Sequence, residues 1–499
     1  MVRTVAIIGA GMAGLSTARA LSEVGFEPTI YEKESEVGGV WAASRRYPGL
    51  TTQNVRSTYC FSDYPYPKDY PEWPTGEQVQ RYLEGYVDFA GLRDRIRLTT
   101  EVTLARQDAL TGRWTVTAND STEDEFDFLV ICNGIYSDPF IPEIPGSGPF
   151  LAAGGRICHT VDFHDREEAR GLHVVVVGYG KSSCDVANSM VDTAASTRVV
   201  ARHLVWKVPR RIKNVLNFKW LLLTRLGENL FPYIELRGVA RFLHGRGRPL
   251  RNGMLAGLQS VITGQQNLDH LGLRPDEQLE TIVNGTVSLE TPGFFEKVAA
   301  GRLSVSRDAT IEALEPGSAV LSTGERVPAD LIVCGTGFHQ RVPFLDTKVQ
   351  RAVTDADGNF RLYRQILPTA VTNLAFNGYN SSFLSQLNAE IGAVWLAAYM
   401  LGSLELPPLK ERESRIAQRQ EWILRRTSGG NACKGTNLVP FSTHNIDELL
   451  GDLGYGISVL TRFKEWLFPV DPRHYRHALE RLKLSASGRH MPETASKTV

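Results

Sequence analysis

The chain lacks a charge excess of either sign, and it lacks long hydrophobic runs. Its 499 residues contain 55 lysines and arginines and 55 aspartates and glutamates. A balanced chain has no general electrostatic attraction to nucleic acid, so we expect no nucleic-acid partner. The longest apolar stretches, near residues 220–223 and 391–401, are well short of the roughly 20 residues that a membrane-spanning helix needs. These absences argue against a membrane protein.

The chain also lacks paired cysteines. Its 6 cysteines are scattered, and no two of them have a CxxC or CxxxxC spacing. This argues against a redox-active dithiol and against a structural zinc site. The 11 histidines are dispersed, without an HExxH pattern, so we predict no metal site.

We also expect no signal peptide, because residues 1–3 run directly into the first predicted strand. A cytoplasmic enzyme is therefore expected. With 42% hydrophobic residues over 499 positions, the chain can bury two or three separate cores.

Two glycine-rich turns, each between a predicted buried strand and a predicted helix, are the most informative features present. In chain order, their key positions are Gly9, Gly11 and Gly14, and then Gly178, Gly180 and Ser183. The first position permits the tight turn, the second lets the backbone approach a pyrophosphate, and the third must be small so that helix and strand pack closely. The helix N-terminus then offers free N–H groups and a positive dipole end to the phosphates. One chain is thus predicted to bind two dinucleotides.

The residues that end the next strand of each unit distinguish the two sites. The predicted strand at residues 28–31 is followed by Glu32, whose carboxylate would accept hydrogen bonds from ribose hydroxyls. The predicted strand at residues 199–201 is followed by Arg202, whose guanidinium would pair with a 2′-phosphate. Lys181, inside the second turn beside Ser182, is a further cation suited to a phosphate. The first site is predicted to bind FAD and the second NADPH.

The order of the predicted elements indicates an α/β fold with two Rossmann-like dinucleotide-binding domains, the NADPH domain being inserted in a discontinuous FAD domain. We expect the first part of the FAD domain at residues 1–165, with a hairpin-like stretch over 96–118. The NADPH domain follows at 166–330 and contains a helical insert at about 206–296, which we interpret as a lid or packing layer rather than a membrane-binding segment. Residues 331–484 return to the FAD domain, and 485–499 are expected to be a disordered tail. The strand at 331–334 leads to Gly337, a predicted second approach of backbone to cofactor.

Together these features resemble the flavin-containing monooxygenases, class B flavoproteins that also include the Baeyer–Villiger monooxygenases. The resemblance covers nearly the whole chain. It includes residues 36–41 (EVGGVW), 47–50 (YPGL), 63–65 (DYP) and 362–364 (LYR). It also includes a family fingerprint that falls on 155–163, with Ala153, two residues earlier, at its leading aromatic position. The resemblance adds Lys33, Gly39, Val40, Trp41 and Val102 to the cofactor-binding residues. We expect His159, within the fingerprint, to orient the linker between the domains rather than to take part in the chemistry.

The resemblance implies an NADPH- and O2-dependent enzyme that forms a C4a-hydroperoxyflavin and oxygenates a soft nucleophile, at nitrogen or sulfur, in a small-molecule substrate. Water exclusion would keep that intermediate from releasing hydrogen peroxide. Monomer and homodimer both remain open.

Two departures from the Baeyer–Villiger pattern favour heteroatom oxygenation. Those enzymes usually end the fingerprint with Trp, where this chain has Phe163, and carry an active-site Asp where this chain has Gln53. Heteroatom-oxygenating relatives place an Asn near the flavin, and Gln53 and Asn54 are both candidates for this catalytic role. Two alternatives are a Baeyer–Villiger enzyme acting on a ketone and an NADPH-dependent disulfide reductase-like flavoprotein, the latter disfavoured by the missing cysteine pair.

Overall fold

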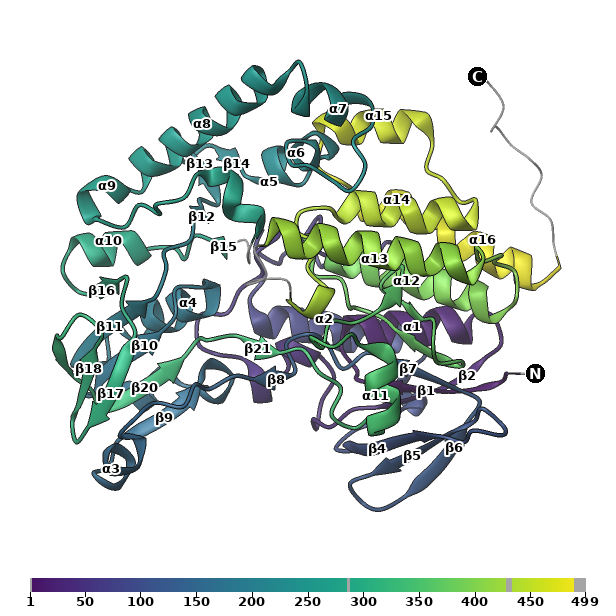
Figure 1. The fold of residues 1–499 in the computed structure, drawn as a ribbon, viewed down its shortest axis with the longest axis horizontal. Coiled ribbons are helices and arrows are strands. Elements are labelled where there is room, and N and C mark those ends of the chain that lie inside the picture. The colour runs from purple at the N-terminus through teal and green to yellow at the C-terminus, as the bar shows by residue number, and fades with distance from the viewer. Residues whose placement is uncertain (1, 285–287, 428–432, 489–499) are drawn as a thin grey trace.

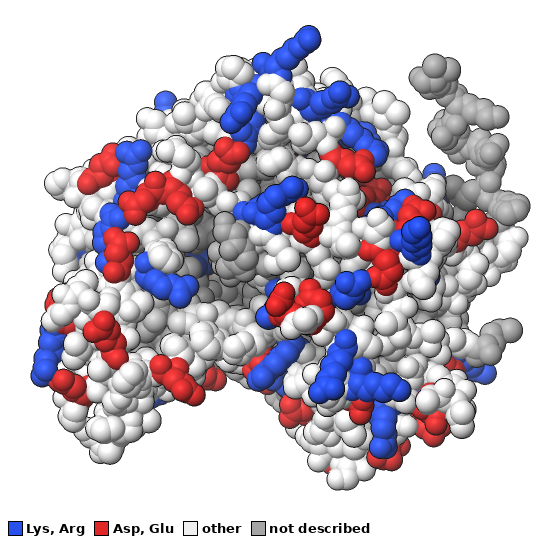
Figure 2. Space-filling model, viewed as in Figure 1, with Lys and Arg blue, Asp and Glu red and all other residues white. Residues whose placement is uncertain are grey.

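The computed structural model describes residues 2–284, 288–427 and 433–488. Two parallel sheets lie side by side, with a helical segment above the second sheet and a group of C-terminal helices above the first (Figure 1). The surface is notched at its lower edge, between the lobes that the two sheets form (Figure 2). The predicted α/β class with two Rossmann-like units is confirmed.

The first sheet contains five parallel strands in the spatial order β24, β7, β1, β2, β3. They are β1 (Thr4–Ile8), β2 (Glu27–Tyr31), β3 (Ile96–Arg97), β7 (Phe128–Ile131) and β24 (Leu374–Phe376). The apolar strands β1 and β7 are buried on both faces, as is typical of parallel sheets covered on each side. On one face pack α1 (Met12–Ser22), α2 (Gly76–Phe89) and α12 (Ser385–Met400), and on the other the antiparallel strands β4 (Val102–Gln107), β5 (Trp114–Ala118) and β6 (Glu123–Phe126).

The late strand β24 shows that the first unit is discontinuous in sequence. It pairs in parallel with β7, with Leu374 opposite Leu129, although the whole second unit lies between them in the chain. The following helix α12 is buried around most of its circumference because α1 and the C-terminal helices pack against it. The predicted return of the chain to the first unit is confirmed.

The second sheet also contains five parallel strands, in the order β16, β11, β10, β20, β9. They are β9 (Arg156–His159), β10 (His173–Val177), β11 (Ser196–Ala201), β16 (Ser304–Arg307) and β20 (Leu331–Cys334). The flanking elements are α3 (Ser147–Ala152), α4 (Lys181–Met190), α10 (Phe294–Ala299), β17 (Ile311–Glu315), β18 (Ser318–Leu321) and β19 (Arg326–Pro328).

Two details differ from the sequence-based expectation. β9 and β20, which the boundaries after 165 and 330 assign to the first unit, pair with each other inside the second sheet. Residues 96–97 form β3 of the first sheet, so the antiparallel hairpin begins only at Val102. In both cases, a short strand is placed by pairing with a distant strand, which local sequence does not reveal.

The chain crosses between the two units along a pair of short strands. β8 (Asp138–Pro139) pairs antiparallel with β21 (Phe338–His339), so the outgoing and returning segments are neighbours. Phe140 N–H donates to Gly337 O at 3.0 Å next to this pair. The proline-rich connector is therefore tied to the segment by which the chain returns.

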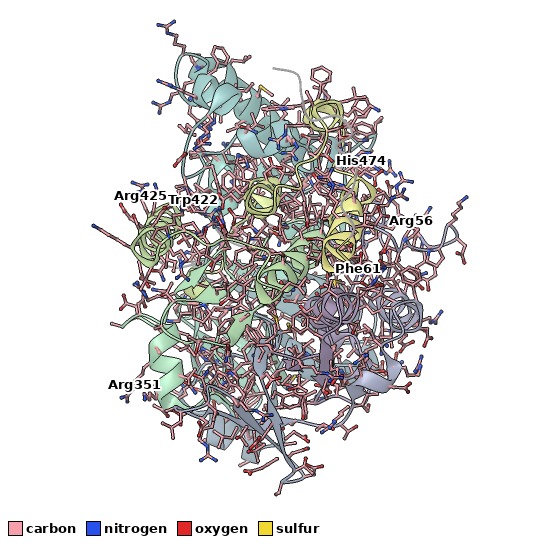
Figure 3. The ribbon with its side chains drawn as sticks, turned by 90° about the vertical axis from the view of Figure 1, so that its right-hand side faces the viewer. Arg56, Phe61, Arg351, Trp422, Arg425 and His474 are labelled. Atoms are coloured by element: carbon pink, nitrogen blue, oxygen red, sulfur yellow. The ribbon has the colours of Figure 1, made fainter. Side chains whose placement is uncertain are left out.

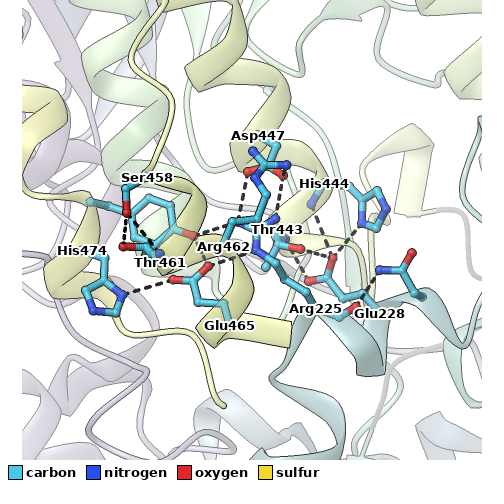
Figure 4. Close-up of polar contacts among 12 residues, drawn as sticks. Arg225, Glu228, Thr443, His444, Asp447, Ser458, Thr461, Arg462, Glu465 and His474 are labelled. Atoms are coloured by element: carbon cyan, nitrogen blue, oxygen red, sulfur yellow. Dashed lines mark hydrogen bonds and ion pairs between the residues drawn. The ribbon is translucent and has the colours of Figure 1, made fainter. Parts of the chain in front are cut away.

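The segment between β11 and β16 is mostly helical, as expected, with two small strand pairs. Its elements are β12 (Lys207–Val208), β13 (Arg211–Ile212), β14 (Leu216–Asn217), α5 (Lys219–Leu222), α6 (Arg225–Asn229), α7 (Gly238–His244), α8 (Arg248–Gln265), α9 (Leu268–Leu271) and β15 (Ser288–Leu289). It packs on the C-terminal helices through a buried ionic network centred on Arg225 and Glu228 of α6 (Figure 4).

The remaining elements cover α12 and the edge of the first sheet. They are α11 (Thr347–Val353), β22 (Leu362–Tyr363), β23 (Leu367–Pro368), α13 (Leu409–Arg426), α14 (Ser442–Leu453), α15 (Val459–Leu467) and α16 (His477–Ala486). α16 extends into the predicted tail by two residues, and positions 489–499 of that tail lie outside the described residues. No helix in the described ranges combines the length and apolar character needed to cross a membrane.

Candidate functional site

The first glycine turn is shaped by contacts that leave no room for side chains at two of its three positions. A Cβ atom at Gly9, where φ is +109°, would lie 2.5 Å from Cys132 O, and one at Gly14 would lie 1.9 Å from Gly9 O. At Gly11, the nearest protein atom to such a Cβ is Gly39 Cα, at an ordinary 3.6 Å. Packing therefore requires Gly9 and Gly14, whereas the space beside Gly11 is available to a ligand.

Glu32, at the end of β2, is buried beside this turn. One carboxylate oxygen accepts from Ala10 N at 2.7 Å and the other from Glu34 N at 3.0 Å. Burial raises the pKa of Glu32, although the two backbone donors oppose that shift. Each oxygen keeps a second lone pair, so the carboxylate can still accept from ribose hydroxyls.

The other residues predicted around the first turn surround the end of β2. Lys33 is exposed next to Glu32, and Thr100 N donates to Glu32 O at 2.8 Å, which brings the chain that leads to Val102 alongside. The 3-10 helix Gly39–Trp41 closes over the turn because Gly38 N donates to Ala10 O at 3.1 Å. Within it, Val40 is exposed and Trp41 is buried edge-on against Tyr59.

The second turn has the same shape and a different third residue. Gly178 has φ of +108°, and a Cβ atom on it would lie 2.6 Å from Gly335 O. A Cβ atom at Gly180 would meet nothing within 4 Å. Ser183 is fully buried and donates from Oγ to Gly335 O at 3.2 Å. Ser182 is partly exposed in the first turn of α4, so the open space of this site also lies at its second glycine and helix N-terminus.

The two predicted phosphate-binding cations lie in different environments. Lys181 is turned inward, where its ammonium forms a buried ion pair with Asp185, and burial lowers its pKa. Lys207 is also buried and donates to Tyr179 O at 2.8 Å. Arg202 is exposed directly after β11, and its guanidinium has no hydrogen-bond or ion-pair partner among the described residues. Arg202 is the cation here that can reach an incoming phosphate without leaving another partner.

Residues 47–54 lie between the two nucleotide turns. Tyr47 OH donates to Asp185 of α4 at 3.4 Å, although Tyr47 belongs to the first unit. Gln53 is exposed and accepts from Leu289 N at 3.1 Å, toward the second unit. Asn54 is buried and donates from Nδ2 to Phe383 O, toward the first unit. The two candidate amides thus face opposite sides of the same junction.

Several buried polar atoms around Asn54 lack partners among the described residues. They belong to Thr52, Asn380 and Ser382, and Phe383, which follows them, carries the carbonyl that Asn54 contacts. Residues 380–382 follow β24 at the carboxyl edge of the first sheet, where ligands bind in open α/β folds. A planar polar ring system placed here would meet these groups, so the residues present fit a flavin.

The segment 380–382 was not among the predicted site residues. The signal that identifies it is the polar run Asn377–Ser382 directly after a buried parallel strand.

His159 connects the second sheet to the crossing segments. Its ring is fully buried, with Nδ1 accepting from Val161 N at 3.3 Å and Nε2 lying 3.0 Å from Gly337 O. An accepting Nδ1 places the proton on Nε2, and burial lowers the pKa of the ring, so the neutral form donates to Gly337. His159 therefore holds the returning segment, and Gly337 takes part through its carbonyl.

The structure offers no arrangement for metal or disulfide chemistry in the part that it describes. No three His, Cys, Asp or Glu side chains gather there in a way that could hold a metal ion. All 6 cysteines are free, and 5 of them are buried.

Comparison with known proteins identifies a family and a set of relatives. The family model described as flavin-binding monooxygenase-like matches residues 2–455. Flavin-containing monooxygenase 3 of Homo sapiens is 26% identical over 505 aligned positions, which cover 95% of this chain and 86% of that protein.

Solved structures with the same fold belong to two kinds of oxygenase. S-allyl-L-cysteine S-oxygenase from Allium sativum superposes with a TM-score of 0.63 at 22% identity, covering 98% of this chain and 99% of the other. Cyclohexanone monooxygenase from Rhodococcus sp. Phi1 bound to NADP+ has a TM-score of 0.67 at 17% identity, covering 91% and 98%. At these identities both show the fold alone.

Proposed function

Because the chain belongs to the flavin-binding monooxygenase-like family, it is an FAD- and NADPH-dependent monooxygenase, and we propose that its substrate is a small molecule with a nucleophilic nitrogen or sulfur. FAD when bound supplies the redox chemistry: it takes hydride from NADPH and activates O2. The protein binds, orients and shields the reacting groups, and each of these tasks can be assigned to residues of this chain.

We propose that the open second glycines define where the two pyrophosphates lie. The space beside Gly11 and Gly180 is open to a ligand, whereas the space where a Cβ of Gly9, Gly14 or Gly178 would lie is filled by protein atoms. The buried Glu32 would orient the ribose of FAD, and the exposed Arg202 would bind the 2′-phosphate of NADPH. The neutral His159 would hold the segment around Gly337 between the two nucleotides.

The observation that carries the choice of substrate is the character of the junction at residues 51–54. Its side chains are threonines and amides, and the position at which Baeyer–Villiger enzymes carry a carboxylate holds Gln53, bonded to Leu289 N. Attack by a sulfide or amine needs a neutral peroxide, whereas ketone oxidation needs the anionic form and a site that lowers the peroxide pKa. The side chains of residues 51–54 are themselves uncharged, and among the hydrogen bonds of the described residues Arg210 contacts the junction only through Thr51, to which it donates at 2.6 Å. The missing carboxylate at position 53 favours the first reaction.

Of the two amides, we propose that Asn54 acts on the flavin side. Its Nδ2 is engaged with Phe383 O, while its carboxamide oxygen accepts no hydrogen bond from the described residues. That oxygen can therefore accept from a bound group beside the unpartnered atoms of Thr52 and Ser382. Gln53 would line the coenzyme side.

Product analysis tests the reaction. Purified FAD-loaded enzyme is given NADPH and O2 with a dialkyl sulfide, a tertiary amine or a cyclic ketone of similar size. We expect sulfoxide or N-oxide formed in proportion to the NADPH consumed, with little ester or lactone. Ester as the main product would reverse the assignment, and NADPH use that yields only hydrogen peroxide with every substrate would contradict a monooxygenase of this substrate class.

The matched pair Asn54→Ala and Gln53→Ala tests the roles of the amides. We expect Asn54→Ala to retain FAD and reduction by NADPH while the fraction of NADPH coupled to product falls about tenfold, because one buried hydrogen bond to the bound group is worth roughly 1.5 kcal/mol. Gln53→Ala should change the KM for NADPH more than the coupling. Equal coupling in both variants and the wild type would place the reacting centre elsewhere.

The cellular location is the remaining part of the proposal. We propose that the enzyme works in the cytoplasm, where NADPH is available to it. Fractionation of cells that express the tagged protein, with and without a high-salt wash, tests this assignment. Recovery of the protein neither in the cytoplasmic fraction nor in the material that the high-salt wash releases from membranes would contradict it.

A further inference from the structure

Helix α15 is held to the rest of the protein by two of its charged side chains, the buried Glu465 and the half-exposed Arg462, rather than by an apolar face. The Glu465 side chain is 1% exposed and accepts from Arg225 Nε at 3.0 Å and from Tyr475 OH at 2.9 Å (Figure 4). Arg462, one turn before, pairs with Asp447 of α14 at 3.1 Å. Because rotating the helix would break these contacts and leave Arg225 buried without Glu465, the orientation of α15 is fixed.

The apolar side chains of α15 consequently face outward. Between 59% and 86% of the surface of each is exposed, and they are Val459, Leu460, Phe463 and Leu467. Their spacing of three and four residues puts them in one stripe along the helix. Phe468, just beyond the helix, and Trp220 of α5 extend the stripe, their rings 5.5 Å apart and both substantially exposed.

Helix α7 and the start of α8 lie at the same end of the molecule as α15 (Figures 1 and 3). They and the residues just before α7 carry a second group of exposed apolar side chains. Its members are Leu236, Val239, Phe242, Leu250 and Met254. Residues 236–268 contain five arginines and no aspartate or glutamate. Three of these arginines, Arg241, Arg246 and Arg248, are exposed and form no ion pair with any described residue. Figure 2 shows basic side chains projecting from this end.

We propose that this apolar-basic face, formed by α15, Trp220, Phe468, α7 and the start of α8, docks on the surface of an anionic lipid bilayer. Helices that lie in a membrane interface combine exposed Leu, Phe and Trp with Lys or Arg, whose charge attracts anionic headgroups. Groups of exposed apolar side chains, as opposed to single ones, mark contacts with a protein or a membrane, and the neighbouring arginines favour the membrane here. The contact requires no spanning helix. It assigns part of the helical insert at 206–296 to a membrane surface, in place of the lid or packing layer expected from its sequence.

A second copy of the chain fits this face less well. A two-fold contact brings the same patch of both copies together, so the exposed arginines would face arginines. No acidic side chain between residues 236 and 268 is present to neutralise them. An anionic bilayer, in contrast, supplies the opposite charge and an apolar layer in one surface.

Co-sedimentation of the full-length, FAD-loaded enzyme with lipid vesicles tests the proposal. The vesicles contain either phosphatidylcholine alone or phosphatidylcholine with phosphatidylglycerol, at low and high salt. The test variant replaces Leu460, Phe463 and Leu467 together by serine. The control, Leu110→Ser, removes a leucine that is 96% exposed in the loop between β4 and β5, at the opposite end of the molecule.

We expect the wild type and Leu110→Ser to bind the anionic vesicles, less strongly in high salt, and the triple variant to bind at least about tenfold more weakly. All three should oxidise NADPH at similar rates, which shows that the triple variant is folded. A wild type that stays in solution, or a triple variant that binds as the wild type does, would overturn the proposal. So would a wild-type dimer in analytical ultracentrifugation that the triple variant abolishes without any vesicle binding, since the face would then be a contact between copies.

Discussion

The two glycine turns meet the same packing requirement with different residues. The first glycines, Gly9 and Gly178, adopt nearly the same φ of +109° and +108°. At the third position the first turn has Gly14, whereas the second has Ser183, which fits because its neighbour across the turn is a glycine. A Cβ atom on Gly335 would lie 2.0 Å from Ser183 Oγ. The comparison teaches that different groups limit the third position: the backbone oxygen of Gly9 excludes a side chain at Gly14, whereas in the second turn the residue that must lack a side chain is Gly335, across from Ser183.

The two turns also differ in the charge that follows the next strand. Glu32 is buried and bonded to the turn itself, while Arg202 is exposed and unengaged by the described residues. The first site is therefore organised by the protein before the cofactor arrives. In the second site, the charged group of Arg202 gains a partner only when the coenzyme binds.

Exchanging the third residue of the first turn should have the largest effect. In Gly14→Ser, the new Cβ would overlap the backbone oxygen of Gly9, and no side-chain rotation relieves that overlap. We expect a cost of about 3 kcal/mol or more and loss of folded, yellow protein. Circular dichroism and flavin absorbance measure this. Normal flavin content would show that the turn can widen, and that the two turns do not differ as described.

The second glycine of the same turn should respond differently. In Gly11→Val, the first added carbon meets only Gly39 Cα at 3.6 Å, so the chain should fold, yet the side chain would occupy the space beside the backbone where the pyrophosphate lies. We expect a folded, colourless protein. Stoichiometric flavin in a folded Gly11→Val variant would remove this turn from the cofactor assignment.

The strand-end charge of the second site should decide the coenzyme. A charge-assisted contact with the 2′-phosphate is worth about 1.5–3 kcal/mol, so Arg202→Ala should weaken NADPH use by about 10- to 150-fold and leave NADH use nearly unchanged. Arg198→Ala is the control, since Arg198 lies on the same strand and pairs with Glu325 at 2.9 Å. Steady-state kinetics with both coenzymes provide the readout. An equal loss with NADPH and NADH would show that Arg202 does not bind the phosphate.

The smallest effect should come from Ser183→Gly, the reverse of the first exchange. This variant loses one hydrogen bond to Gly335 O and leaves the close helix-to-strand approach intact. We expect a cost of about 1 kcal/mol, a fall of about 2–4 °C in the thermal midpoint of the domain, and NADPH binding near that of the wild type. A large loss of NADPH binding would mean that Ser183 contacts the coenzyme rather than the protein.

Much of the fold follows from local sequence, and the exceptions share one cause. The glycine turns, the strands around them and the return of β24 are encoded by short apolar runs that end in glycine or polar residues. Residues 156–159 also form a short strand, but they join the second sheet because β20, far along the chain, is their partner. A four-residue strand carries no information about which sheet it enters.

For the candidate site, sequence identified the residue types better than their partners. The open positions at Gly11 and Gly180 and the exposed Arg202 agree with their predicted roles, which remain proposals. The place of Lys181 in the turn predicts a phosphate contact, but its ammonium is held in an ion pair by Asp185, one helical turn later. The orientation of α15 could not be inferred locally, because the contact between Glu465 and Arg225 joins two distant segments.

The antiparallel pairing of β8 with β21 has a consequence for how such a molecule can be assembled or taken apart. The chain leaves the first unit and returns to it at adjacent points, so the whole second unit is one continuous insertion in the first. A hairpin turn of about two to five residues is enough to join two antiparallel strands. Replacing residues 140–337 by such a turn should therefore preserve the strand order of the first sheet. A single gene insertion could have created the two-nucleotide enzyme, and the reverse deletion would produce a flavin-binding module without its coenzyme domain.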